Sequence, residues 1–223
     1  MKPQNVKLIT HPLVSDLVSH LRDAKTSSLL FRTYSKEMSK MLFYEALKDL
    51  KTKPKKVITQ TGIEFEGPVV NEKVVFVAIL RAAMGMLATA MEIYPEGEFH
   101  VVGVKRSEDP MKKAPYFYLD RLNEIDKNAS RVLVLDPMLA TGGSMLTVVD
   151  ALRVKYKFPK RIQIVSYIAA LKGAELINNK YPDVDIYCAG FDQKLNSNAY
   201  IVPGLGDAGD KYFGINSDLS SIV

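Results

Sequence analysis

One stretch, Arg131 to Leu152, limits most strongly how this chain can fold. Its apolar run Val132–Leu135 is typical of a strand buried on both faces, because no polar position is left for a solvated side. Asp136 ends the run, and a short loop then reaches the sequence Thr-Gly-Gly-Ser at 141–144. Beyond it, apolar residues recur with helical spacing up to Leu152. The stretch therefore predicts a buried strand, a tight loop and a helix.

The loop in this stretch has the composition of an anion-binding site. Glycines and small hydroxyl residues before a helix let several backbone N–H groups converge where the helix dipole already favours negative charge. No lysine follows the glycines, unlike the loop of nucleotide triphosphatases. Asp136 would repel a phosphate and should face neutral hydroxyl groups, so a ribose 5-phosphate suits both parts. An ordinary turn capped by the threonine or serine of 141–144 is the alternative.

Four further segments are predicted strands of the same sheet. They are Val74–Leu80, Val101–Lys105, Ile162–Ala170 and Asp185–Ala189. Their alternation with helical patterns predicts a doubly wound α/β fold, in which a mainly parallel sheet is flanked by helices and the crossovers are right-handed. Before this core, helical spacing from Pro12 to about Leu50 predicts an arm, and residues 56–70 resemble the two strands of a hairpin.

Two other segments carry candidate ligand-binding residues. Arg81 follows the predicted strand 74–80, at the edge of the sheet where open α/β folds bind ligands; an arginine paired with a nearby surface acid is the alternative. Gly204, Gly206 and Gly209 match the spacing of a dinucleotide-binding turn, but they follow the last predicted strand, whereas that turn belongs after the first. We predict instead a loop whose backbone approaches a flat ligand closely.

Composition narrows the class of protein. Hydrophobic residues make up 47% of the chain and charged residues 25%, and no apolar run reaches the roughly 20 residues of a membrane helix. The N-terminal residues lack a secretory pattern, and a single cysteine, Cys188, excludes an internal disulfide framework. We therefore expect a cytoplasmic protein. Cys188 itself is interpreted as a small core residue. Three scattered histidines argue against a zinc site.

The charge balance leaves two classes of ligand open. A formal charge of +5 and a pI near 9.1 suit either a polyanionic small substrate or a nucleic acid. The densest basic run, the lysines between positions 48 and 56, is interpreted as a solvated surface at a helix end.

Taken together, the motifs resemble those of uracil phosphoribosyltransferases. They are DPMLATGGS at 136–144, LRA at 80–82, Arg106 after a predicted strand and YIVPGLGDAGD at 200–210. The resemblance runs from His11 to Gly214. It implies transfer of the phosphoribosyl group of 5-phosphoribosyl 1-pyrophosphate (PRPP) to N1 of uracil, giving UMP and pyrophosphate, with Mg²⁺ as cofactor.

The same resemblance implies the type I phosphoribosyltransferase fold, with a small hood subdomain and an N-terminal helical arm. We expect a single domain over residues 1–223. Its core would span about 71–195, the arm and hood strands about 1–70, and the uracil-binding hood loop about 196–214.

Roles for individual residues also follow from the resemblance. The catalytic residues would be Arg81, Arg106, Asp136 and Asp207. PRPP would be bound by these four and by Pro137, Met138, Leu139, Ala140, Thr141, Gly142, Gly143 and Ser144. Uracil would be bound by Ile201, Gly206, Asp207 and Ala208. No side chain would ligate the metal directly, since Mg²⁺ would be held mainly by pyrophosphate, ribose hydroxyls and waters.

Three positions depart from the usual patterns. Ala83 stands where the family commonly has glycine in its pyrophosphate loop, a segment whose backbone is expected to be strained. Lys105 replaces a usual aromatic residue beside Arg106. Pro137 occupies the place of the second acid of the general phosphoribosyltransferase motif, as it does in this subfamily.

The resemblance also makes predictions about partners, and one rival hypothesis for the function is left open. The resemblance suggests a homodimer or homotetramer and allows GTP as an effector, while neither a membrane nor a nucleic acid is an expected partner. The rival is an RNA-binding pyrimidine regulator on the same fold with weak transferase activity, which would need a basic face with stacking or polar readers. The lysines at 48–56 are its only candidate. A uridine kinase would require a P-loop, which the sequence lacks.

Overall fold

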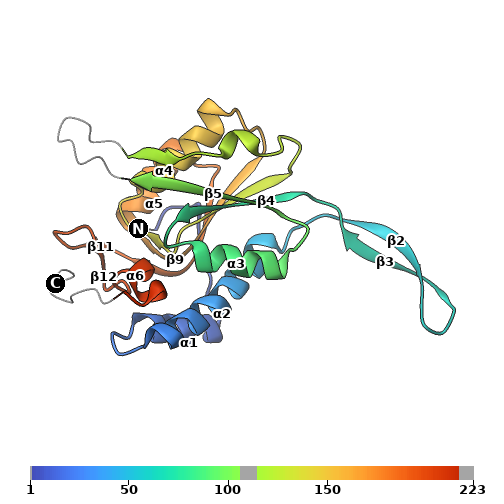
Figure 1. Ribbon diagram of the computed structural model, residues 1–223, viewed down its shortest axis with the longest axis horizontal. Helices are drawn as coiled ribbons and strands as arrows, with labels where there is room; N and C mark the ends of the chain where they lie inside the picture. Colours follow the sequence, from blue (N-terminus) through green and yellow to red (C-terminus); the bar gives the residue numbers. More distant parts are fainter. Residues whose placement is uncertain (1, 106–114, 216–223) are drawn as a thin grey trace.

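The computed structural model describes residues 2–105 and 115–215, and an eight-stranded sheet forms its centre (Figure 1). Its strands are β1 Val6–Leu8, β4 Val74–Leu80, β5 Glu98–Lys105, β6 Tyr116–Leu119, β7 Arg131–Leu135, β8 Met138–Leu139, β9 Arg161–Ala170 and β10 Asp185–Asp192. Their order is β1-β10-β9-β7-β4-β5-β6, with β8 beside β9. Within the described sheet only β6 runs antiparallel to its neighbour. The predicted mainly parallel sheet is confirmed.

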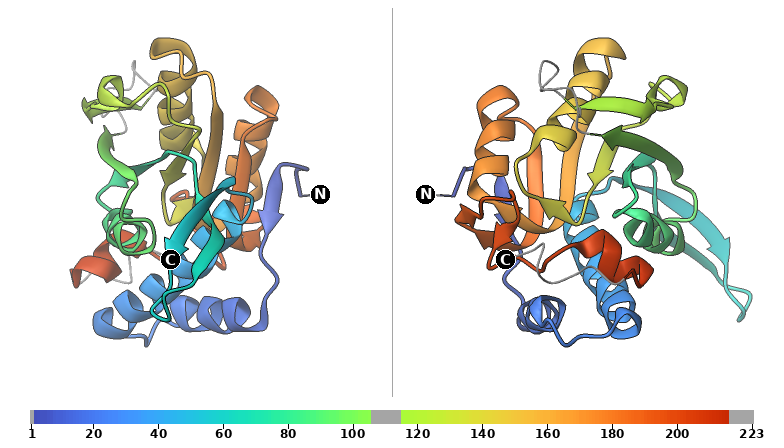
Figure 2. Two further views of the ribbon diagram at one scale, coloured as in Figure 1. Left: turned by 90° about the vertical axis from the view of Figure 1, so that its right-hand side faces the viewer. Right: turned by 60° about the vertical axis from the view of Figure 1, so that its left-hand side comes forward.

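Helices cover both faces of this sheet (Figure 2). They are α1 Pro12–Arg22, α2 Ser28–Leu47, α3 Met84–Ile93, α4 Gly143–Asp150, α5 Leu171–Lys180 and α6 Ala208–Phe213, with a 3₁₀ turn at Leu122–Glu124 and a π turn at Ala151–Lys155. On β4, Phe76 belongs to the core under α1, α2 and α3, whereas Val77 belongs to the core under α4 and α5. Burial on both faces explains the unbroken apolar run and confirms the doubly wound fold. No helix in the described ranges is long and apolar enough to cross a bilayer.

Sequence reasoning missed the shortest strands. β1 has three residues and β8 has two, which is too few to show a period. β1 pairs in parallel with β10, where Val6 lies opposite Ile186. Cys188 on β10 is buried, and burial raises its pKa to about 12, so its interpretation as a small core residue is confirmed.

A hairpin of β2, Thr52–Ile58, and β3, Glu64–Val70, extends away from the body of the molecule (Figure 1). Its pairing is antiparallel, as predicted. Several large apolar side chains along it are exposed, among them Ile58 at 69% and Phe65 at 56%. A two-stranded hairpin is marginally stable by itself, so this element needs further support.

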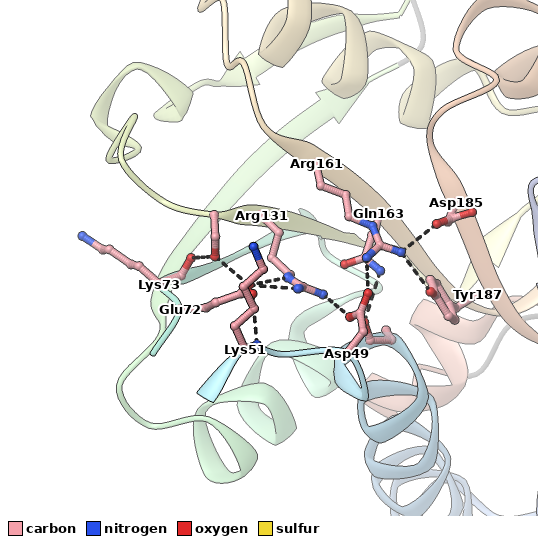
Figure 3. Close-up of polar contacts among 11 residues, drawn as sticks. Asp49, Lys51, Glu72, Lys73, Arg131, Arg161, Gln163, Asp185 and Tyr187 are labelled. Carbon is pink, nitrogen blue, oxygen red and sulfur yellow. Dashed lines mark hydrogen bonds and ion pairs between the residues drawn. The ribbon is translucent and has the colours of Figure 1, made fainter. Parts of the chain in front are cut away.

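An ionic network anchors the base of that hairpin to the amino-terminal ends of the parallel strands (Figure 3). Arg131, the first residue of β7, donates to Glu72 at 2.8 Å and to Asp49 at 2.6 Å. Arg161, the first residue of β9, donates to Asp49 and to Asp185. Glu72 also accepts from the backbone N–H of Lys51. The network therefore lies at the opposite edge of the sheet from Asp136.

Candidate active site

The strand order places a crevice where the sequence-predicted residues lie. From β4 the chain crosses through α3 to β5 on one side, whereas β7 and β9 lie on the other side of β4. Such a reversal opens a ligand-binding crevice outside the carboxyl ends of the strands. Arg81 directly follows β4 and Asp136 directly follows β7. The two strands pair in parallel, with Ala78 opposite Leu135, so both residues lie at the same edge.

The loop after β7 is fixed to β9 and encloses a small cavity. The carbonyl of Pro137 accepts hydrogen bonds from the backbone N–H groups of Tyr167 and Ile168, and β8 continues the contact by pairing with the end of β9. The cavity has a volume of about 140 Å³. Its lining consists of Asp136, Met138, Leu139, Ala140, Thr141, Gly142, Gly143, Ser144 and Met145. Pro137 is buried and lines no part of it.

The main-chain amides of 141–144 point to an anion. Gly142 precedes α4 with φ +82°, a left-handed conformation that glycine adopts without strain. None of the described residues accepts a hydrogen bond from the amides of 141–144, and no side chain caps α4. The alternative of an ordinary turn capped by threonine or serine is therefore wrong. Unpaired donors at the positive end of the α4 dipole have the arrangement that favours an anion.

Gly173 on α5 leaves space for the loop at 136–144 to pack against the helix. Sequence reasoning did not identify this residue. A Cβ atom at Gly173 would lie 2.6 Å from the carbonyl oxygen of Ala140 and 3.0 Å from that of Leu139. Both are backbone atoms of the phosphate loop, so a larger residue would displace the loop itself. A glycine inside a helical pattern is the sequence signal that could have identified Gly173, because such a glycine often has a packing role.

Asp136 is partly buried at the edge of the small cavity. Its Oδ1 accepts a hydrogen bond of 3.2 Å from the Met138 N–H. Burial raises the pKa of the Asp136 carboxyl to about 7, although the Met138 hydrogen bond acts in the opposite direction. A carboxylate in this setting gains from neutral hydroxyl donors, because each hydrogen bond to the charged form favours it. The hydroxyls of a ribose meet that requirement.

A larger cavity of about 440 Å³ adjoins the phosphate loop. Ala82, Met138 and Ala140 line it from the core, and residues 198–201 and 206–209 line it from the other side. Met138 and Ala140 line both cavities, so the two are neighbours. The predicted uracil residues Ile201, Gly206, Asp207 and Ala208 all lie in this lining. The volume falls within the range typical of small-molecule sites.

The side of this cavity opposite Ala82, Met138 and Ala140 includes a short hairpin that sequence reasoning did not resolve. β11, Lys194–Leu195, pairs with β12, Ile201–Val202. In the turn between them, Oδ1 of Asn196 accepts from the backbone N–H groups of Asn198 and Tyr200. The lining residues missed from sequence are Ala82, Asn198, Ala199, Tyr200 and Gly209. The cluster of Asn and Ser at 196–198 is a turn signal that would have located most of them.

Asp207 lines this cavity, and Arg81 directly precedes another lining residue, Ala82. Oδ1 of Asp207 accepts from the Asp210 N–H at 2.9 Å and so caps α6. The Arg81 side chain is 66% exposed, with Nη2 3.8 Å from Oδ1 of Asp210. The guanidinium also lies 5.9 Å from the centroid of the Phe213 ring. The structure thus shows the alternative, an arginine paired with a nearby acid, although the exposed side chain can still exchange that weak pair for a ligand phosphate. Arg106 lies outside the described residues.

Ala83, where the family commonly has glycine, does not adopt a left-handed backbone conformation. Its φ is −83° and its side chain is fully buried in the core under α3. A methyl group therefore meets no left-handed penalty at this position. In the same turn the Leu80–Arg81 peptide bond is cis.

Within the described ranges no group of three or more His, Cys, Asp or Glu side chains converges to hold a metal ion.

Comparison with known proteins agrees with this geometry. A sequence model of one family, described as uracil phosphoribosyltransferase, matches residues 8–215. The chain belongs to this family. It is therefore an enzyme of the uracil phosphoribosyltransferase class, and the resemblance inferred from the motifs is confirmed.

Individual relatives cover almost the full chain. The uracil phosphoribosyltransferase of Ureaplasma urealyticum serovar 10 is 40% identical over 210 residues, covering 93% of this chain and 98% of the relative. That of Metamycoplasma arthritidis is 40% identical over 207 residues, covering 93% and 97%. Among solved structures, the AQ2163 protein from Aquifex aeolicus superposes with a TM-score of 0.83 at 34% identity, covering 96% of this chain and 100% of the other. An adenine phosphoribosyltransferase from Trypanosoma brucei, at TM-score 0.56 and 13% identity, shares the fold.

Proposed function

We propose that this chain transfers the 5-phosphoribosyl group of PRPP to N1 of uracil, giving UMP and pyrophosphate. One observation carries the assignment to these residues: unpaired amides at 141–144 and the Asp136 carboxyl share a small cavity that adjoins a larger one lined by the hood loop. The small cavity suits the 5-phosphate and ribose, and the larger one suits a base at the anomeric carbon. Family membership supports the same substrates.

In this proposal each residue group has one task. The amides of 141–144 bind the 5-phosphate, and Asp136 accepts hydrogen bonds from the ribose hydroxyls. Arg81 and Arg106 contact the pyrophosphate, where guanidinium forks match phosphate oxygens. The transition state should have oxocarbenium character, as in glycoside cleavage. Negative charge would grow on the leaving pyrophosphate, where the two arginines would stabilise it. No nucleophilic side chain is needed, since positioning of both reactants supplies much of the rate.

Base selection would depend on the backbone of the hood loop. Ile201 and the segment 206–208 line the large cavity, where main-chain N–H and C=O groups would match O2, N3–H and O4 of uracil. Cytosine presents a different pattern of donors and acceptors, so it would leave at least one buried group unpaired. The proposed specificity is therefore for uracil over cytosine.

Mg²⁺ fits this site as a substrate-bound ion. Mg²⁺ in phosphate-transfer sites commonly keeps several waters and uses one or two carboxylates together with substrate phosphates. The carboxylates available here are Asp136, in the small cavity, and Asp207, in the large one. We propose that the ion is held mainly by pyrophosphate, ribose hydroxyls and waters, with Asp207 toward those waters. When bound, it would neutralise charge on the leaving pyrophosphate.

Two of the five lysines in the basic segment on which the RNA-binding hypothesis depends are paired with acids. Lys48 pairs with Glu45 at 2.8 Å, and Lys56 pairs with Glu64 at 2.9 Å across the β2–β3 hairpin. These pairs offset positive charge that an RNA backbone would require. The comparisons also name only transferases for the full-length relatives reported above.

A homo-oligomer and regulation by GTP are further parts of the proposal. The exposed apolar side chains of the β2–β3 hairpin would be covered by a second copy of the chain, since closed symmetric homo-oligomers are the commonest assemblies. Deleting residues 53–69 should lower the mass measured by light scattering to that of a monomer; an unchanged mass would exclude the hairpin from the interface. Titrating GTP into the transfer assay tests the effector, which rests on the family resemblance alone.

The activity itself is tested by incubating the pure protein with PRPP, Mg²⁺ and each pyrimidine base in turn. We expect UMP and pyrophosphate in equal amounts from uracil, and no product without PRPP. A shift of RNA mobility on a gel at physiological salt, in the absence of UMP formation, would favour the regulator instead.

The domain division, with a core of about 71–195, an arm and hood strands of about 1–70, and a hood loop of about 196–214, is part of the same proposal.

A further inference from the structure

We infer that Arg22, at the last turn of α1, is a positioning residue for the base: together with Asp192 it holds the hood loop at Gly204 in the geometry that reads uracil. The inference rests on the proposed role of Ile201 and 206–208 in base binding. It gives the N-terminal arm a part in substrate selection, although α1 lies far from the site in sequence.

The contacts form a closed cluster around Gly204. Arg22 Nη1 donates to Oδ2 of Asp192 at 2.7 Å, and Nη2 donates to Oδ1 of the same carboxylate at 2.8 Å. Nη1 also donates to the Gly204 carbonyl at 2.8 Å. The Gly204 N–H in turn donates to Oδ2 of Asp192 at 3.0 Å. Both backbone groups of Gly204 are therefore bound by one bidentate, charge-assisted pair.

Arg22 and Asp192 are largely buried, so each charge depends on the other for pairing. The Arg22 side chain is 22% exposed and that of Asp192 is 7% exposed. A Cβ atom at Gly190, two residues before Asp192 on β10, would lie 3.0 Å from Arg22 Nη2, so the glycine leaves room for the guanidinium. An Asp192 carboxylate without Arg22 would be a nearly buried, unpaired charge, which is strongly unfavourable.

Between its two base-lining segments the loop is held by apolar packing of Leu205, which is buried in the core, and by the polar contacts at Gly204. β12 consists of two residues, and Gly204 lies between Ile201 and the segment 206–208. Gly204 has φ +57°, and a Cβ there would lie 2.1 Å from the Ile201 carbonyl oxygen, so the turn is tight and needs glycine. A displacement at Gly204 would therefore be passed directly to both groups of base-lining residues.

A second contact from the same end of α1 supports this role. Lys211 on α6 donates through Nζ to the carbonyl of Asp23 at 2.8 Å, one residue after Arg22. The end of α1 thus contacts the hood segment on both sides of Asp207. Recognition by main-chain groups requires placement within about half an ångström, and these contacts supply a rigid support for it.

The test compares two single substitutions in otherwise identical protein. Arg22→Lys keeps the charge but cannot fork to Asp192 and also reach Gly204. Arg153→Lys is the matched control: Arg153 is 20% exposed, pairs with Asp183 and also donates to a backbone carbonyl, that of Lys160. We measure the KM for uracil, the KM for PRPP and amide hydrogen exchange over residues 201–208.

For Arg22→Lys we expect the KM for uracil to rise about tenfold, with the KM for PRPP changed less than about twofold and exchange over 201–208 accelerated. Arg153→Lys should leave all three values unchanged. Unchanged exchange and an unchanged uracil KM in Arg22→Lys would overturn the inference, as would an equal rise in both KM values. If the wild-type protein formed no UMP, the proposed function would fail, while the exchange comparison would still decide whether Arg22 holds the loop.

Discussion

Replacing Asp136 with asparagine should stabilise the folded protein while impairing its activity. Asparagine has nearly the same shape as aspartate and can still accept from the Met138 N–H, but it carries no charge. In the wild type, burial raises the carboxyl pKa from 3.8 to about 7, so above neutral pH folding must place an ionised group in an unfavourable environment. The substitution removes that penalty.

The size of the gain follows from this pKa. At about 1.4 kcal/mol for each pH unit, a change from 3.8 to about 7 sets an upper limit of about 4 kcal/mol. Because the side chain is only partly buried, solvent screens the charge, and we expect a gain in unfolding free energy of about 1 to 2 kcal/mol at pH 8.

The pH dependence gives the decisive signature. Well below the unfolded-state pKa of 3.8 the carboxyl is protonated in both folded and unfolded chains, so Asp136→Asn should match the wild type there and differ from it far less at pH 4 than at pH 8. Between about pH 4 and 7 the unfolded chain ionises first, so the wild type loses stability relative to the variant as the pH rises. The gain should level off at about pH 8, one unit above the folded-state pKa of about 7.

Urea unfolding without ligand at pH 4, 6 and 8 measures this difference, and steady-state UMP formation measures the functional cost. We expect kcat/KM for PRPP to fall about ten- to a hundredfold, because hydrogen bonds from ribose hydroxyls to a charged acceptor are worth roughly 1.5–3 kcal/mol. A variant no more stable than the wild type at pH 8, or one equally stabilised at pH 4, would refute the reasoning.

Three further predictions concern other parts of the site. Gly173→Ala should raise the KM for PRPP at least about tenfold, because its methyl group would displace the Ala140 carbonyl; an unaltered KM in steady-state assays would contradict this packing argument. Arg106→Ala should lower turnover about a hundredfold, by analogy with removal of an oxyanion donor, and an unchanged kcat would remove it from the pyrophosphate site. CMP formation from cytosine should be at least about a hundredfold slower than UMP formation from uracil; comparable rates measured by chromatography would disprove base reading by the hood loop.

The sheet and the strand, loop and helix around residues 136–144 could be predicted because their signals are local. Strand 74–80 was predicted with the bounds that β4 has in the structure, since burial on both faces leaves an unbroken apolar run. Arg81 was predicted to lie at the carboxyl edge of the sheet, where open α/β folds bind ligands, and Asp136 at the end of its own strand; that their strands are neighbours came from the structure. The absence of a cap on α4, which decided between an anion site and an ordinary turn, required coordinates.

Long-range polar contacts could not be predicted from sequence. Arg22 and Asp192 are 170 positions apart, and no period or motif connects them. Arg131 begins the stretch that organises the fold, yet its role in binding Glu72 and Asp49 depends on how the hairpin base meets the sheet. Which charged residues pair depends on how the chain folds. In the sequence, each of these residues resembles an ordinary surface charge.

The expectation about Ala83 shows a different limit. The family's usual glycine suggested a strained backbone, but φ at Ala83 is −83° and its methyl group packs in the core. A residue type common at a position therefore does not establish the backbone conformation there. Close approach by other atoms is a separate reason for glycine, as at Gly173.

The most direct test of the whole account is a crystal structure of the protein with PRPP and Mg²⁺. We predict that the 5-phosphate lies about 3 Å from the main-chain nitrogens of 141–144 and that the Asp136 carboxylate accepts from the ribose hydroxyls. A phosphate bound elsewhere, or an Asp136 side chain turned away from the sugar, would contradict the assignment.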